Sequence, residues 1–127
     1  MADFKKVPAG EYMCFLSILR NGVTKTGKPK VSFAYKVCDG EYKGNFIWDN
    51  CTCVNETGYS ITAKKINLLT NGNAVATADI IKAIVENNTA FESYAQNIKT
   101  LVGTNKFHVS VSVTDDGFDR VYIKKEN

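Results

Sequence analysis

Hydrophobic and polar residues alternate with a period of two over several stretches of the chain, and this pattern predicts β-strands. The alternation is clearest at 30–38, where every second residue is a large apolar one. A stretch at 10–20 is apolar on both faces, which is typical of a strand covered on both sides. Further strands are predicted at 43–54, 106–113 and 118–125.

Between 60 and 103 the period changes, and apolar residues recur at the spacing of three and four that an amphipathic helix requires. Residues that commonly begin and end helices divide this block into three parts. We expect one helix over 61–70 with Ser60 as its N-cap, one from Thr77 or Ala78 to Glu86, and one from the capping box Thr89–Glu92 to Gly103.

Three strands, a helical block and a closing hairpin therefore follow one another in the order β-β-β-α-β-β. This order is typical of the OB-fold, a small five-stranded barrel that often binds oligonucleotides. A chain of 127 residues is long enough for one core. The sequence thus predicts a single, mainly β, α+β domain over 1–127. We expect a five-stranded OB-like barrel with an enlarged helical segment at 60–103, between strands three and four.

The composition is that of a globular protein, because 44% of the residues are hydrophobic and 23% are charged. The formal net charge of +3 permits a nucleic-acid partner without requiring one. No stretch approaches the roughly 20 apolar residues of a membrane span, and the first residues do not resemble a signal peptide. We therefore expect a cytoplasmic protein with no membrane partner.

The four cysteines, Cys14, Cys38, Cys51 and Cys53, include no Cys-x-x-Cys pair, and His108 is distant from them in sequence. In a reducing compartment, buried free thiols are the expected state of cysteines in strands. A zinc site and a reactive or redox pair are the alternatives. We expect no metal and no cofactor.

Signatures of catalysis are lacking in this sequence. His108 is the only histidine, and there is neither a Gly-x-Ser-x-Gly motif nor a phosphate-binding loop. Asp115, Asp116 and Asp119 fall at the predicted hairpin tip, where turn formation explains carboxylates. We expect a binding protein rather than an enzyme. His108 is interpreted as a surface strand residue, with contact to a phosphate or base as the alternative.

Aromatic and cationic residues are interleaved on the predicted strands in the way that binding of single-stranded nucleic acid requires. Aromatic rings stack on bases, and cations follow the phosphates. We expect Trp48, Phe46 and Tyr122 to stack. The cations of the same expected interface are Arg20, Lys25, Lys28, Lys30, Lys36, Arg120 and Lys124.

A purely structural interpretation of these residues is also open. A small barrel needs large rings inside, so Trp48 and Tyr122 could belong to the core, and the lysines of the loop at 21–30 could simply be solvated. The acidic residues at 115–119 would repel phosphates. We therefore expect a bound nucleic-acid strand to follow the end of the binding cleft that lies away from this acidic hairpin tip.

Four segments together resemble a phage and prophage family of single-stranded DNA-binding proteins from replication and recombination gene clusters. They are Val7–Tyr12, Thr24–Pro29, Asp39–Asn50 and Gly117–Ile123. The resemblance implies an OB-like fold and non-catalytic binding of single-stranded DNA in the cytoplasm of a bacterial host. It also implies self-association as a dimer, and a phage recombinase or a host protein as a further partner.

A second hypothesis is a phage protein-binding module that inhibits a host defence nuclease, as anti-CRISPR proteins do. The modest net charge, the acidic hairpin tip and the extra helices favour it. Binding through phosphates weakens steeply with salt, whereas tight protein binding survives it, so salt dependence separates the two hypotheses. The preference between DNA and RNA stays open.

Overall fold

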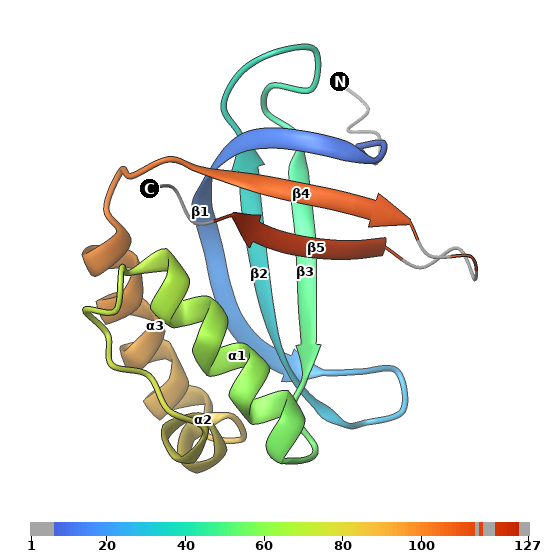
Figure 1. The fold of residues 1–127 in the computed structure, drawn as a ribbon. Coiled ribbons are helices and arrows are strands. Elements are labelled where there is room, and N and C mark those ends of the chain that lie inside the picture. The colour runs from blue at the N-terminus through green and yellow to red at the C-terminus, as the bar shows by residue number, and fades with distance from the viewer. Residues whose placement is uncertain (1–6, 114, 116–118, 125–127) are drawn as a thin grey trace.

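Five strands and three helices make up the fold in a computed structural model, which describes residues 7–113, 115 and 119–124 (Figure 1). The elements follow one another as three strands, three helices and two strands. The fold is therefore α+β, as the sequence predicts. The bounds are β1 Gly10–Val23, β2 Pro29–Val37, β3 Phe46–Thr52, α1 Glu56–Leu69, α2 Ala78–Ile84, α3 Asn88–Val102, β4 Phe107–Val113 and β5 Asp119–Lys124.

The strands form one antiparallel sheet in the order β3-β2-β1-β4-β5. The 14-residue β1 holds it together, since residues 10–14 pair with β4 and residues 14–23 pair with β2. In Figure 1, β4 and β5 cross β2 and β3 at a steep angle. The order in the sheet thus differs from the order in the chain, and β3 and β5 are its two open edges.

The sheet does not close into the expected five-stranded barrel, because β3 and β5 are not hydrogen-bonded to each other. A side chain of α1 links them instead. The Nζ of Lys65 forms an ion pair with Asp49 of β3 and lies 3.3 Å from the carbonyl oxygen of Val121 in β5.

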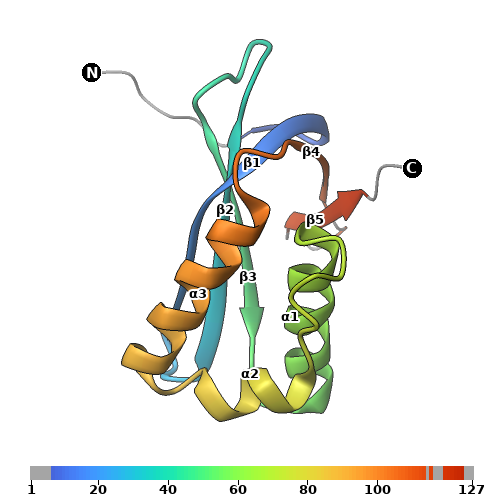
Figure 2. The same cartoon turned by 90° about the vertical axis from the view of Figure 1, so that its left-hand side faces the viewer.

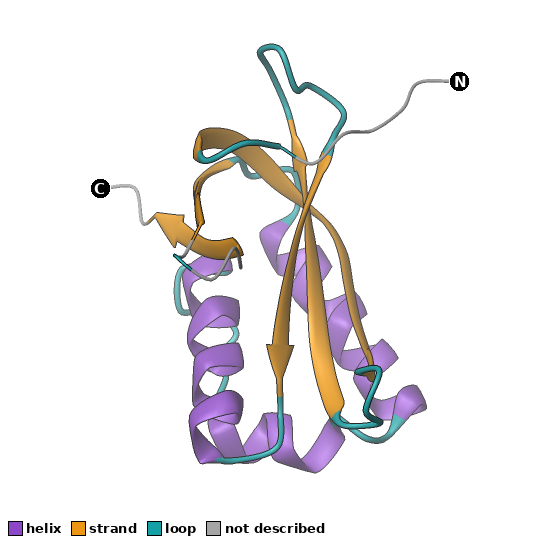
Figure 3. Ribbon diagram, turned by 90° about the vertical axis from the view of Figure 1, so that its right-hand side faces the viewer, coloured by secondary structure: helices purple, strands orange, loops and turns teal. Residues whose placement is uncertain are grey.

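The core lies between the helices and the inner face of β1–β3. Phe33 and Tyr35 of β2 are fully buried, as are Ile66 of α1 and Phe91 of α3. Viewed from the side, α1 and α3 run along the strands while α2 joins their ends (Figures 2 and 3). The amide of Asn21 ties β1 to the α2–α3 connection by donating to the carbonyl of Val85 at 2.8 Å.

Two of the expected helix starts are wrong. The N-cap of α1 is Asn55, whose side chain accepts from the backbone N–H of Gly58 at 2.9 Å, and Ser60 lies inside the helix. The N-cap of α3 is Asn87, two residues before the expected Thr89. In both cases an extended asparagine satisfies a free amide of the first turn, so the helix begins earlier. The start of α2 after Thr77 and the end of α3 at Gly103 are confirmed.

The third strand is shorter than expected because turns occupy 39–44. Gly44 adopts a φ of 91°, and the backbone N–H of Lys43 bonds to the carbonyl of Gly40. In β4 the inward positions 107, 109 and 111 are buried as expected, whereas Val113 is 54% exposed at the strand end. Within the described residues, no helix has both the length and the apolarity needed to cross a membrane.

All four cysteines are free thiols, and Cys14, Cys51 and Cys53 are buried as expected, while Cys38 is half-buried. Burial raises the pKa of the Cys14 thiol to about 12 and that of Cys51 to about 11. These thiols stay protonated at neutral pH, so they behave as small apolar core groups.

Candidate nucleic-acid interface

One face of the β1–β3 strands points away from the core, and we call it the outer face. Strand pairing places its residues side by side, because directly opposed residues project to the same side of a sheet. The outer face carries Arg20 of β1, Lys30, Ser32, Ala34 and Lys36 of β2, and Phe46, Trp48, Asn50 and Thr52 of β3. Five of the ten expected interface residues therefore lie together on it.

Four of these side chains form a row in which two neighbouring aromatic rings have a cation at each end. The guanidinium carbon of Arg20 lies 4.9 Å from the centre of the Trp48 ring. The Trp48 and Phe46 rings have centroids 6.4 Å apart and planes tilted by 40°, and the Nζ of Lys36 lies 5.7 Å from the centre of the Phe46 ring. The Trp48 side chain is 41% exposed, so it is not a core residue.

A β-bulge brings Arg20 into this row. Phe15 pairs with Lys36 and Arg20 pairs with Ser32, so β1 advances five residues while β2 advances four. The extra residue lies between Leu16 and Ile18. If the same sequence paired without a bulge, Arg20 would lie opposite Val31 and project into the core, from the face on which Leu19 lies now.

Small and polar side chains line the outer face between the rings and the cations. Ala34 is fully buried opposite Trp48, which leaves room for the large ring. The hydroxyl of Ser32 donates to Oδ1 of Asn50 at 2.6 Å, and this bond orients the Asn50 amide. Neither Ser32 nor Asn50 was expected in the interface. Their parity, shared with Lys36 and Trp48, is the sequence signal that could have found them.

Two further expected cations lie in the β1–β2 hairpin loop. Lys25 and Lys28 are exposed there. The backbone N–H of Thr24 bonds to the Lys28 carbonyl at 2.8 Å, and Gly27 turns the chain with a φ of 82°. The loop follows directly on the end of the outer face that carries Lys30, so it extends the positive charge beyond the strands.

The expected residues of β5 lie apart from the outer face. Arg120 and Tyr122 are exposed and line a hollow of about 320 Å³ between the open edges of β3 and β5 and helix α1. We call this hollow the β3–β5 groove. Lys124 is not part of it and forms an ion pair with Glu11 of β1, whose positive partner lowers the pKa of the Glu11 carboxyl. The expected acidic tip lies mostly outside the described residues.

A buried polar cluster lies under the groove. The Tyr35 hydroxyl donates to Oδ2 of Asp49 at 3.0 Å, and Lys65 pairs with the same carboxylate. Burial, and next the negative charge of Asp49, raise the pKa of Tyr35 well above its ordinary value. Asp49 lies in the middle of β3, and its carboxylate is hydrogen-bonded and its charge compensated. It links β2, β3 and α1.

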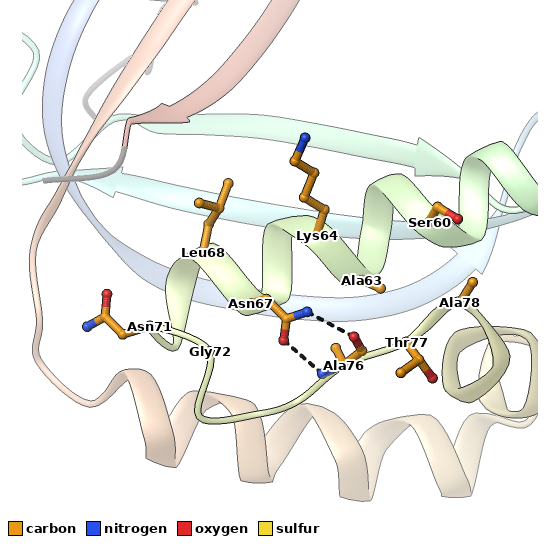
Figure 4. Close-up of a pocket in the computed structure, with 10 residues that line it drawn as sticks. All are labelled: Ser60, Ala63, Lys64, Asn67, Leu68, Asn71, Gly72, Ala76, Thr77 and Ala78. Atoms are coloured by element: carbon orange, nitrogen blue, oxygen red, sulfur yellow. Dashed lines mark hydrogen bonds between the residues drawn. The ribbon is translucent and has the colours of Figure 1, made fainter.

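A second hollow of about 550 Å³ lies between α1 and the segment that leads to α2 (Figure 4). The Asn67 amide bonds there to both the N–H and the carbonyl of Ala76, at 2.7 and 2.9 Å. Lys64 is the one charged side chain among the ten lining residues drawn, and none of them is aromatic. This arrangement holds a connecting segment in place and offers no stacking surface.

A protein-family model described as "Protein of unknown function (DUF669)" matches residues 1–126. No curated protein matches the chain.

Proposed function

The chain belongs to the DUF669 family, and we propose that it binds single-stranded DNA across the outer face of β1–β3. In this proposal Trp48 and Phe46 stack on bases, while Arg20, Lys30 and Lys36 contact phosphates. Lys25 and Lys28 of the hairpin loop continue the path. The resemblance stated above supports a role of this binding in phage DNA replication or recombination.

The row of Arg20, Trp48, Phe46 and Lys36 is the observation that carries the proposal. Stacking of a base on an exposed ring is worth roughly 1–3 kcal/mol and tolerates any sequence, because every base has a flat face. Each ring of the row has a cation beside it. A strand that stacks along the row thus brings its phosphates close to positive charge.

The fold supports the same proposal. OB-folds are partly open five-stranded barrels that bind oligonucleotides on the face of strands two and three and at the loops after strands one and four. We propose that this chain is an OB-like barrel opened between β3 and β5. Its cation–aromatic row lies on β1–β3, and its lysine-bearing loop joins β1 to β2.

Fluorescence anisotropy with a labelled oligothymidine of about 30 nucleotides tests the proposal, since this length spans several OB-fold sites. Binding should favour the single strand over a duplex of the same length and should weaken as salt rises. Trp48→Ala should reduce the affinity, whereas Leu101→Ala, which removes an exposed apolar side chain of α3, should not.

Absence of binding at micromolar protein and low salt would exclude this function. Affinity for a host protein that survives high salt would then support the protein-binding alternative. Binding of the oligonucleotide with equal strength by the parent protein and Trp48→Ala would disprove the stacking role of the row.

A further inference from the structure

The β3–β5 groove has walls of mixed chemistry. Tyr122 is 52% exposed and Ile61 of α1 is 45% exposed, so an aromatic and an aliphatic side chain both face solvent there. Arg120 adds a positive charge at the same hollow. Lys65 also lines it, but its charge is compensated by the ion pair with Asp49. The groove thus offers one ring, an apolar contact and the positive charge of Arg120.

The groove is continuous with the outer face. Asn50 and Thr52 project from the outer face of β3 and also line the groove. Asn50 lies opposite Ser32 of β2 and is two residues after Trp48 in β3, on the same face of the sheet. A single strand of DNA that leaves the cation–aromatic row at Trp48 therefore reaches the groove by crossing the open edge of β3 at Asn50.

The size of the groove limits what enters it. A volume of about 320 Å³ lies at the lower end of the roughly 300–1,000 Å³ that small-molecule sites span. This space suits one nucleotide rather than several. The positive charge of Arg120 suits a phosphate. The Asp49 carboxylate does not neutralise this charge, because it is already bound by Lys65 and Tyr35.

We infer that the β3–β5 groove is a separate subsite for one nucleotide of the bound strand, next to the stacking row. The base stacks on Tyr122, the phosphate pairs with Arg120, and the Asn50 amide contacts the strand where it crosses the edge of β3. This inference rests on the proposed function, since it assumes a single strand on the outer face. Two subsites across a sheet edge make the affinity depend on oligonucleotide length in two steps.

A series of labelled oligothymidines from about 4 to about 16 nucleotides, the range of OB-fold site sizes, tests the inference by anisotropy. The parent protein should gain affinity once when the row is filled and again when the strand is long enough to reach the groove. Tyr122→Ala and Arg120→Ala should abolish the second gain only. For Tyr122→Ala the loss should be at least about fivefold with the longer probes.

Matched variants distinguish the two subsites. Tyr122→Phe keeps the ring and should keep the second step, while Trp48→Ala should weaken binding at every length. Lys82→Ala removes an exposed cation of α2 and should change nothing. Thermal unfolding of each variant establishes that it is folded.

If Tyr122→Ala and Arg120→Ala bind every length as the parent does, or if the parent shows a single step, the groove is not a subsite although the proposed function stands. If the parent binds no probe, the proposed function fails and the subsite with it.

Discussion

The hydroxyl of Tyr35 donates a hydrogen bond of 3.0 Å to the carboxylate of Asp49, which also holds the ammonium group of Lys65. Three elements, β2, β3 and α1, meet in this cluster, and the contact of Lys65 with the Val121 carbonyl adds β5. A charged pair replaces backbone pairing between the two open edges of the sheet. The cluster therefore links β3 and β5 through side chains at the place where the sheet is open.

Replacement of Lys65 by methionine should destabilise the protein by about 3 kcal/mol, the lower end of the range for loss of one partner from a buried pair. The side chains of Lys65 and Asp49 are 16% and 8% exposed, so the carboxylate left behind is poorly hydrated. Urea unfolding measures the loss. Lys64→Met, at an exposed position of the same helix, should change stability by less than about 0.5 kcal/mol.

Adding Asp49→Asn to Lys65→Met should restore part of the stability, because the unpaired charge is then gone. A double variant less stable than Lys65→Met alone would show that the Asp49 carboxylate acts mainly through Tyr35.

Period-two alternation was sufficient to group Lys36, Phe46 and Trp48, because antiparallel pairing preserves the parity of each strand. It could not group Arg20 with them. Five positions separate Arg20 from Phe15, which an unbroken strand would place on the opposite face, and no glycine or proline between them marks the bulge. The alternation pattern also could not predict that the sheet is open between β3 and β5, since the contacts of Lys65 that span this opening depend on tertiary packing.

Competition between capping residues explains the missed helix starts. Ser60 and Thr89 are acceptable N-caps, but Asn55 and Asn87 lie earlier and have extended backbones from which the side chain reaches a first-turn amide. Local sequence does not reveal which of two capable residues has the extended backbone. The preceding strand and turn determine it.

Asn55→Ala should cost about 1 kcal/mol, the usual loss when an N-cap side chain is removed. The Asn55 side chain accepts from the N–H of Gly58 at 2.9 Å, and alanine leaves that amide unsatisfied. Ser60→Ala should change stability by no more than about 0.5 kcal/mol, because Ser60 is exposed inside α1. Thermal or urea unfolding of the two variants compares them directly. The reverse order of losses would contradict the capping role of Asn55.

Gly58→Ala should destabilise the protein by about 1–3 kcal/mol, although alanine normally favours a helix over glycine. A Cβ at Gly58 would lie 2.2 Å from the carbonyl oxygen of Thr52, which is backbone and cannot move aside cheaply. The first turn of α1 would have to shift away from β3. Thr57→Ala at the neighbouring exposed position is the control. Unchanged or increased stability of Gly58→Ala would show that α1 does not approach β3 this closely.

Stability should fall as pH rises above 9. Burial raises the pKa of Cys14 from 9.0 to about 12 and that of Cys51 from 9.0 to about 11. Both raised values mean that the folded state keeps protons that the unfolded chain loses. Their contribution is therefore complete below pH 9 and declines as pH approaches the folded pKa values. Each thiol should contribute a slope of up to about 1.4 kcal/mol per pH unit.

Urea unfolding between pH 8 and 10.5 measures this slope. Cys14→Ala should make the decline shallower, apart from a constant loss due to the smaller side chain. An identical slope in the parent and the variant would show that the Cys14 thiol does not titrate differently on unfolding.

Arg20→Ala should weaken oligothymidine binding and also reduce its salt dependence. Each phosphate contact on a single strand contributes about 0.7 to the slope of log affinity against log salt, so loss of one contact should lower the slope by that amount. Trp48→Ala should weaken binding with the slope unchanged, because stacking releases no counterions. Lys82→Ala, an exposed cation outside the interface, should leave both quantities as they are. An unchanged slope in Arg20→Ala would mean that the guanidinium group, which lies 4.9 Å from the Trp48 ring, supports the ring without touching the phosphates.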